Sequence, residues 1–204
     1  MARFVDRDGW LWPVDDKHCH AAVFNMSNLD LALGHVRNFG VCVQAGGNCG
    51  VWPRRLAEVF GTVYTFEPDA ENFHCLVHNV PALNVVKLQA VLASSRGCIG
   101  LAPDGANNCG AYYVQGEGAY PSLMVDDLAL SACDFICLDV EGKEPEALSG
   151  AWTTIMKHRP VVMVEEKGLS VRFGYTPSYV EEWLGRLSYR VAHRLPRDLI
   201  FVPT

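Results

Sequence analysis

The stretch from residue 41 to residue 69 constrains the fold of this chain more than any other. An apolar run, Val41–Ala45, precedes a glycine-rich segment, Gly46–Gly50, and a second apolar run ends at Glu67. This order is typical of a strand, a glycine loop, a helix and a second strand with an acid at its end. A glycine loop lets the backbone approach a ligand, and an acid about 20 residues later can bind both hydroxyls of a ribose. The stretch therefore predicts a site for an adenosine-containing ligand.

The glycine loop departs from two known phosphate-binding patterns. When Gly47 and Gly50 are aligned on the dinucleotide pattern Gly-x-Gly-x-x-Gly, Ala45 stands where the first glycine belongs, and the P-loop pattern of NTPases is absent. A cofactor without a pyrophosphate fits better, and S-adenosylmethionine is such a cofactor. For the loop alone an ordinary strand-to-helix turn is the alternative, and the Glu67-Pro68 pair favours the cofactor site.

Length and composition predict a globular protein. The 204 residues are 50% hydrophobic and 20% charged, which is enough for one domain with its own core. We expect a single domain over 1–204, with an N-terminal arm over 1–27 and a glycine-rich insertion over 94–121. The insertion is either a tolerated surface segment or a wall of the site, in which case we expect it beside the acceptor substrate rather than beside the cofactor.

Charge and cysteine content limit the partners and the compartment. The net charge is −6, from 23 acids against 17 bases, so neither a nucleic-acid partner nor a membrane partner is expected. No run approaches the roughly 18 apolar residues of a membrane span, and no signal peptide is visible. We expect a cytoplasmic protein whose eight cysteines are reduced and mostly serve as small core residues. The oligomeric state is left open.

Strand-like and helix-like segments alternate along the chain. This alternation predicts an α/β fold, a doubly wound, mostly parallel seven-stranded sheet with helices on both faces, as in the Rossmann-like class. The expected strands are 41–45, 62–66, 85–92, 135–138, 161–164, 189–192 and 199–202. The expected helices are 28–38, one from about 50 to 61, one capped by Asp69, 125–130, one after Pro145, and 177–187.

Acids at strand ends are the candidates for chemistry, because ligands of open α/β sheets bind outside the carboxyl ends of the strands. Asp139 and Glu141 follow an apolar strand, and period-two geometry turns both to one side if the extended backbone continues. Gly142 follows at once, as if to leave room for a ligand. We predict that Asp139 and Glu141 are catalytic. We interpret the acids Glu144, Glu146 and Glu166 as solvated strand ends or helix caps.

Two histidine-containing segments are weaker candidates. His18-Cys19-His20 has metal-ligand chemistry, but consecutive residues rarely converge on one tetrahedral ion, so we expect a surface segment and no metal there. His193, near the last two strands, is a further candidate base, although a surface histidine is the favoured interpretation.

These residues together resemble the FkbM-type S-adenosylmethionine-dependent methyltransferases. Each piece is a weak signal, whereas their order and spacing are specific, and the resemblance runs from about residue 40 to the end. The pieces are Gln44–Gly50, Phe66-Glu67-Pro68 with Asn72 and Leu76, Val125–Leu128, Leu138–Gly142 with Ala147-Leu148 and Gly150-Ala151, Arg159-Pro160, and Asp198–Pro203.

The resemblance implies a class I methyltransferase fold and methyl transfer to a hydroxyl of a sugar or small metabolite, so that the partner is a small-molecule or glycan acceptor. It places Gly46, Gly47, Asn48 and Gly50 around the methionine part of the cofactor, Glu67 on the ribose, Gln89 and Ala90 near the adenine, and Asp139 and Glu141 between cofactor and acceptor. Gln44 stands where the family normally has an acid. Its amide can accept a hydrogen bond from the cofactor's ammonium, but without the charge assistance that strengthens such a bond.

The expected mechanism has two versions. In the favoured one, Asp139 or Glu141 removes the hydroxyl proton, helped by a pKa that burial raises. In the other, Asp139, Glu141 and Glu165 bind Mg²⁺, which lowers the pKa of the hydroxyl. Two other functions stay open at this point, a nicotinamide-dependent oxidoreductase and a non-catalytic cofactor-binding subunit.

Overall fold

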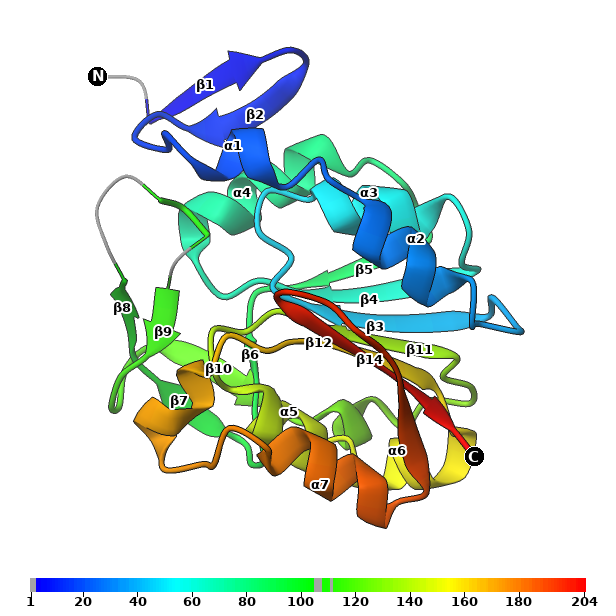
Figure 1. Cartoon of the computed structure of the whole chain (residues 1–204). Helices are drawn as coiled ribbons and strands as arrows, with labels where there is room; N and C mark the ends of the chain where they lie inside the picture. The colour runs from blue at the N-terminus through cyan, green and yellow to red at the C-terminus, as the bar shows by residue number, and fades with distance from the viewer. Residues whose placement is uncertain (1–2, 105–107, 111) are drawn as a thin grey trace.

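A seven-stranded sheet lies at the centre of the structure, a computed structural model that describes residues 3–104, 108–110 and 112–204 (Figure 1). Its strands are β3 (Val41–Ala45), β4 (Thr62–Phe66), β5 (Val85–Leu88), β11 (Phe135–Leu138), β12 (Val161–Glu165), β13 (Tyr189–Arg194) and β14 (Asp198–Pro203). Their order is β13-β14-β12-β11-β3-β4-β5. β14 pairs antiparallel with both neighbours and the other pairings are parallel. The predicted mostly parallel α/β sheet is confirmed.

Helices cover both faces of this sheet, because its central strands are apolar on both sides. In β11, Phe135 and Cys137 pack on one face, and Ile136 and Leu138 pack on the other. Three helices cover the first face: α2 (Ser27–Leu33), α3 (Val51–Ala57) and α4 (Ala70–Asn79). The second face is covered by α5 (Glu144–Ser149), α6 (Trp152–His158), α7 (Tyr179–Arg186) and the 3-10 helix η1 (Val125–Leu128), and a further 3-10 helix, η2 (Leu169–Phe173), follows β12.

Local signals set most of these boundaries. Asp69 caps α4 as predicted, since its Oδ1 accepts hydrogen bonds from the backbone of Glu71 at 3.0 Å and of Asn72 at 2.9 Å. The helix predicted over 28–38 ends earlier, at Leu33. The amides of His35 and Val36 bond to carbonyls three residues back, which tightens the last turn and stops the helix.

The strand predicted over 85–92 is divided between two sheets. The chain leaves the central sheet after Leu88, and Val91–Leu92 forms β6, which pairs parallel with β10 (Tyr120–Leu123). Both halves of the run are apolar, so composition alone did not show that the pairing partner changes.

The N-terminal segment forms a hairpin, β1 (Phe4–Arg7) and β2 (Trp10–Pro13), followed by the short helix α1 (Cys19–Ala22). Asn79 at the end of α4 joins this hairpin to the rest of the protein. Its Oδ1 accepts the amide of Leu11 at 2.8 Å, and its Nδ2 donates to the carbonyls of Leu11 at 2.9 Å and Cys49 at 2.7 Å.

The glycine-rich insertion contains small sheets of its own. β7 (Gly97–Ile99) pairs with β10, and β8 (Leu101–Pro103) forms a hairpin with β9 (Tyr112–Val114). The positions 105–107 and 111 of the predicted insertion lie outside the described residues. Within the described ranges, none of the helices combines the length and the apolar character needed to cross a membrane.

Candidate active site

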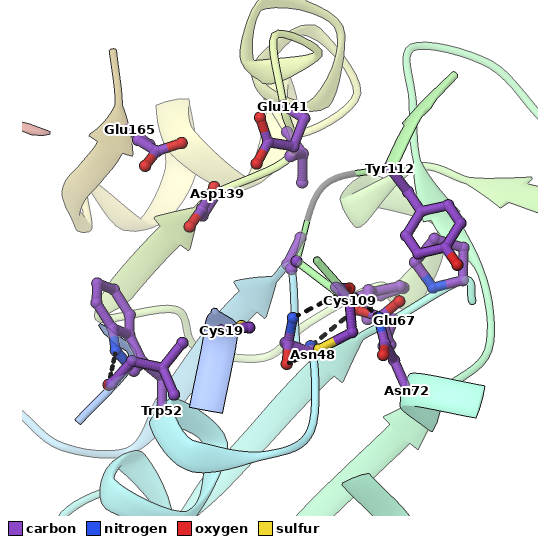
Figure 2. A pocket seen from close by; sticks show the side chains of 18 of the residues that line it. Cys19, Asn48, Trp52, Glu67, Asn72, Cys109, Tyr112, Asp139, Glu141 and Glu165 are labelled. Atoms are coloured by element: carbon purple, nitrogen blue, oxygen red, sulfur yellow. Dashed lines mark hydrogen bonds between the residues drawn. The ribbon is translucent and has the colours of Figure 1, made fainter. Parts of the chain in front are cut away.

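A cavity of about 550 Å³ opens at the carboxyl ends of β3, β4, β11 and β12, where open α/β sheets bind ligands. Its volume lies in the range of small-molecule sites, roughly 300–1,000 Å³. Figure 2 shows two groups of polar side chains in its wall. One group is Glu67, Asn48, Asn72, Cys109 and Tyr112, and the other is Asp139, Glu141 and Glu165.

The glycine loop is fixed by the strands on either side of it. The amides of Gly46 and Gly47 donate to the carbonyl of Phe66 at 3.0 and 2.9 Å. Gly46 has a φ of 83°, and a Cβ there would collide with the carbonyl oxygen of Asp139. Close packing against the end of β11 therefore requires this glycine, whereas the sequence pattern predicted a glycine that makes room for a ligand.

Gln44 lies beneath the glycine loop and outside the cavity wall. Its Nε2 donates to the carbonyl of Gly46 at 2.9 Å, and its Oε1 accepts from the hydroxyl of Thr65. Because both ends of the amide are used by the protein, this geometry does not support the expected hydrogen bond to a cofactor ammonium. Gln44 instead holds the loop. Gly50, the N-cap of α3, also lies outside the cavity lining.

Glu67 ends β4 and is only 6% exposed. Its Oε2 accepts the amide of Asn48 at 2.7 Å and its Oε1 accepts the amide of Asp69 at 2.9 Å. Burial outweighs these hydrogen bonds and raises the pKa of Glu67 to about 8. In its charged form the carboxylate offers about four acceptor positions, so two stay available to a ligand in the cavity.

The segment 108–110 forms the wall beside Glu67. The carbonyl of Cys109 accepts hydrogen bonds from Nδ2 of Asn72 at 2.6 Å and of Asn48 at 3.4 Å. Tyr112 in β9 lies on the same side (Figure 2). The insertion therefore borders the group around Glu67, which corrects the expectation that it borders the acceptor side alone. The reason is that Asn48 and Asn72 bind its backbone.

Asp139, Glu141 and Glu165 form the second polar group. One carboxylate oxygen of each lies within 4.8 Å of those of the other two. Burial raises the pKa of Asp139 well above its usual range, and the charge of Glu165, with which Asp139 shares a hydrogen bond, raises it further. Burial also raises the pKa of Glu141. Both effects favour the protonated form of Asp139.

A tight turn aims Glu141 at this cluster. The carboxylates of Asp139 and Glu141 meet as predicted, but the reason is different, since the extended backbone ends at Leu138 and Glu141 has a φ of 53°. Gly142 follows at 100°, and a Cβ there would lie 2.7 Å from the backbone of Leu169. The glycine makes room for Leu169 and not for a ligand.

Glu144 stabilises the same turn. It is 4% exposed, and its Oε1 accepts the amides of Val140 at 3.1 Å and Gly142 at 3.3 Å. Burial raises the pKa of Glu144 to about 7. The interpretation of Glu144 as a solvated acid is therefore wrong, because the turn encloses its carboxyl group.

Lys167 and Arg197 bring positive charge to the cluster. Lys167 Nζ lies 3.2 Å from Glu141 Oε1 and also contacts Oε2 of Glu165, whose other oxygen accepts from Arg197 at 2.9 Å. Burial lowers the pKa of Lys167, but the negative charges of Asp139 and Glu165 outweigh this effect and raise it. The lysine therefore stays protonated among the carboxylates.

The remaining predicted residues are divided between the cavity and the surface. Ala90 lines the cavity, whereas Gln89 is exposed and its Nε2 donates to the carbonyl of Pro68 at 3.4 Å. His18 lines the cavity, and Nδ1 of its neighbour His20 lies 2.9 Å from the carboxylate of Asp16. His193 pairs with His35 outside the cavity lining, with 2.9 Å between the two Nε2 atoms.

Three residues of the wall, Lys167, Arg197 and Cys109, are not among the predicted site residues. Lys167 stands two positions after Glu165, so the rule that located the acids could have located it too. Arg197 precedes β14, which runs antiparallel, and its place beside Glu165 depends on that reversal. No sequence pattern marks Cys109 as a site residue, because a glycine-rich composition does not show where the segment folds back onto the sheet.

Comparisons with known proteins agree with this geometry. Methyltransferase FkbM from Methylobacillus flagellatus KT shares the fold at a TM-score of 0.56 and 18% identity, over 88% of this chain and 46% of that one. SMU.1697c from Streptococcus mutans, solved in complex with SAH, has a TM-score of 0.53 and 9% identity, over 87% of this chain and 96% of that one. A SAM-dependent methyltransferase from Aquifex aeolicus has a TM-score of 0.50 and 13% identity, over 93% of this chain and 95% of that one.

The chain thus spans less than half the length of the Methylobacillus protein. A comparison with curated protein sequences gives no significant match. The sequence matches the methyltransferase FkbM domain over residues 45–191, which is most of the chain and includes β4, β5, β11 and β12 of the central sheet in full. The chain belongs to the FkbM family of S-adenosylmethionine-dependent methyltransferases.

Proposed function

We propose that this methyltransferase binds S-adenosylmethionine in the cavity and methylates a hydroxyl oxygen of a sugar or small metabolite. One observation carries the proposal. The wall of a single cavity holds Glu67, an acid suited to bind ribose hydroxyls, in one part and a cluster of carboxylates around Asp139 in another. The SAH bound to the Streptococcus mutans protein supports the choice of cofactor.

The residues present fit this cofactor. The loop Gly46–Asn48 would hold the methionine part, the free acceptor positions of Glu67 would take the ribose hydroxyls, and Ala90 with Val91 would face the adenine. All of them line the cavity. The family match favours this cofactor over a nicotinamide and supports a catalytic role.

The cofactor supplies a methyl group already activated by a sulfonium, so the protein must align the acceptor and remove its proton. The raised pKa of Asp139 favours its protonated form, which can donate a hydrogen bond to the acceptor oxygen. The ammonium of Lys167 opposes the effect of burial on the pKa of Glu141, whose carboxylate can receive the hydroxyl proton. This proposal gives the two acids different roles.

This mechanism is metal-free. The three carboxylates are close enough to bind a divalent cation, and oxygen ligands suit Mg²⁺. However, the ammonium of Lys167 contacts two of them and Arg197 contacts one, so protein groups already supply the positive charge. A cation at this position would have to displace Lys167.

The same balance of charge supports a neutral acceptor. Lys167 and Arg197 pair with the carboxylates of Glu141 and Glu165, so two positive groups face two acids here. A polar but uncharged ligand fits such a site better than a strongly charged one, because it leaves no unpaired charge in the cavity. Hydroxyl-rich metabolites and sugars are of this kind.

Calorimetry with the purified protein tests the cofactor assignment. We expect S-adenosylmethionine and its demethylated product to bind and NAD not to bind. Glu67→Ala should weaken binding by roughly 1.5–3 kcal/mol per lost charged hydrogen bond. The control is Glu71→Ala, an exposed acid in the first turn of the following helix α4. Binding of NAD alone, or full affinity in Glu67→Ala, would contradict the assignment.

A further inference from the structure

Four of the eight cysteines pack together beside the cofactor cavity. Cys19, Cys49, Cys75 and Cys109 belong to one buried cluster with Trp12. They come from helix α1, the glycine loop, helix α4 and the glycine-rich insertion, and all four are free thiols. Tertiary folding, and not sequence spacing, gathers them.

Asp16 holds two of these cysteines against each other. The same carboxylate oxygen, Oδ1, accepts the backbone amide of Cys19 at 3.1 Å and that of Cys109 at 3.3 Å. Both cysteines belong to one buried cluster and line the cavity. A Cβ at Gly110 would lie 3.2 Å from the Cys19 sulfur, so the residue after Cys109 packs on this thiol. A disulfide requires two backbones that approach each other, and the shared acceptor Asp16 brings these two together.

Access and reactivity distinguish this pair from the other cysteines of the cluster. Cys19 and Cys109 each keep 8% exposure and line the cavity, whereas Cys49 and Cys75 are fully buried. Hydrogen bonds from the thiols of Cys19 and Cys49 lower the pKa of Cys109. The hydrogen bond to Cys109, together with burial, raises the pKa of Cys19. Cys109 is therefore the nucleophilic sulfur, and Cys19 is placed to resolve its oxidised form.

We propose that Cys109 is a site of oxidation by hydroperoxides and that it forms a disulfide with Cys19 across the cavity wall. The Cys109 thiolate attacks the O–O bond of hydrogen peroxide, an S–O bond forms, and hydroxide leaves. The Cys19 sulfur then loses its proton and attacks the Cys109 sulfur, an S–S bond forms, and the sulfenic oxygen leaves as water. Overall, two thiols lose two electrons and two protons, and one peroxide is reduced to two waters.

The arrangement favours a disulfide over a metal site. In the described part of the chain, the group of ligand atoms that all lie within 4.8 Å of one another is the set of Asp139, Glu141 and Glu165. The sulfurs of Cys19, Cys49 and Cys109 do not form such a group. Cys109 stands between two thiols, so it can pair with one of them but does not enclose an ion with both.

The disulfide has a consequence for the cofactor, and this part rests on the proposed function. The carbonyl of Cys109 already binds Asn48 of the glycine loop and Asn72 of α4. A covalent bond to Cys19 would fix the segment 108–110 between these residues and the N-terminal helix α1. Uptake and release of the cofactor past this wall should then be slower in the oxidised protein.

Peptide mapping of the full chain after treatment with hydrogen peroxide tests the site. We expect a cross-linked peptide pair containing Cys19 and Cys109, its loss in Cys109→Ser, and a Cys109 sulfenic acid, trapped by dimedone, in Cys19→Ser. Cys49→Ser should keep the disulfide. Cys98→Ser is the matched control, because Cys98 is exposed in β7 of the same insertion. Oxidation confined to Cys98, or a disulfide between Cys109 and Cys49, would overturn the proposal.

Stopped-flow binding of S-adenosylmethionine tests the consequence. The association rate should fall in the peroxide-treated protein, recover with dithiothreitol, and stay unchanged by peroxide in Cys109→Ser. An unchanged rate in protein with the mapped disulfide would overturn the effect on the cofactor. Absence of binding in the reduced protein would instead contradict the proposed function, and the mapping experiment would still decide on the disulfide.

Discussion

Two acids at the end of β11, Asp139 and Glu141, have different environments, which their places in the sequence do not reveal. Asp139 shares a hydrogen bond with Glu165, and both burial and this neighbour favour its neutral form. Glu141 lies 3.2 Å from the ammonium of Lys167, which favours its charged form. A protonated carboxyl donates a hydrogen bond, and a charged carboxylate accepts a proton. The position of one lysine therefore assigns the two roles.

The two amide substitutions should have unequal effects. Glu141→Gln removes the group that accepts the proton, and kcat should fall by about 10²–10⁴-fold, which is the usual contribution of a general base. The raised pKa of Asp139 favours its protonated form, and Asp139→Asn replaces this carboxyl with an amide of the same shape that also donates a hydrogen bond, so the loss of kcat should be much smaller. Single-turnover methyl transfer at saturating cofactor measures both.

Glu146→Gln is the matched control for this comparison, since Glu146 pairs with Lys143 on α5 and does not line the cavity. Its kcat should stay that of the unmodified protein. Equal losses in Asp139→Asn and Glu141→Gln would show that Asp139 is charged during the reaction. Full turnover in both variants would show that neither acid takes part.

At the level of elements, the sequence determines the strands well and their pairing less well. β3, β4 and β11 have the predicted bounds, because each is a short apolar run that glycine or charged residues flank. Both halves of the run 85–92 are mostly apolar, yet the second half pairs with β10 and not with the central sheet. Apolar character shows that a strand is buried. The strand with which it pairs depends on where a segment distant in the sequence folds back onto the sheet.

The N-terminal hairpin shows how one side chain can join an element to the core. Asn79 is 4% exposed and makes three hydrogen bonds to the backbones of Leu11 and Cys49. Asn79→Ala leaves these backbone groups without partners, and each buried polar group without a hydrogen bond costs about 1–3 kcal/mol of stability. We expect the free energy of unfolding in urea to fall by at least that amount, with faster proteolysis in residues 4–13.

His78→Ala is the control for Asn79→Ala, because His78 is exposed on the same helix. Its unfolding free energy should be almost unchanged. If Asn79→Ala is as stable as this control, the hairpin is held by its apolar contacts and the three hydrogen bonds contribute nothing net.

At the level of the whole molecule, the site is assembled from segments that are far apart in the sequence. Glu67 and Asp139 could be predicted, since the ends of parallel strands meet at one edge of the sheet. Asp16, Cys109 and Arg197 could not be predicted, since their positions depend on how the N-terminal arm, the insertion and an antiparallel strand fold onto that edge. Sequence reasoning therefore found the parts of the site that lie on the sheet and missed those that close it.

The buried acids also make a prediction about the stability of the whole fold. Burial raises the pKa of Glu67 from 4.5 to about 8 and that of Glu144 from 4.5 to about 7, and it also raises those of Glu141 and Asp198. A raised pKa means that the folded state holds the proton more tightly than the unfolded state. The stability gained in this way is complete below the pKa that the group has in the unfolded state. It is lost as the pH rises through the pKa that the group has in the folded state.

Asp16 has the opposite effect, because backbone amides and His20 lower its pKa from 3.8 to about 2 against the effect of burial. Its contribution is present above pH 3.8 and is lost as the pH falls toward 2. The two effects together place the maximum of stability on the acid side of neutrality. Between pH 4.5 and pH 8 the free energy of unfolding should therefore decrease.

Urea denaturation across this range of pH measures the decrease. Each unit of pKa difference corresponds to roughly 1.4 kcal/mol, so Glu67 alone accounts for a loss of several kcal/mol at most. Glu67→Gln keeps the shape of the side chain but cannot ionise, and its stability should depend much less on pH. Glu71→Gln, which changes an exposed acid nearby, should behave like the unmodified protein. If the free energy of unfolding instead rises from pH 4.5 to 8, Glu67 is charged in the folded protein, and its two backbone hydrogen bonds outweigh its burial.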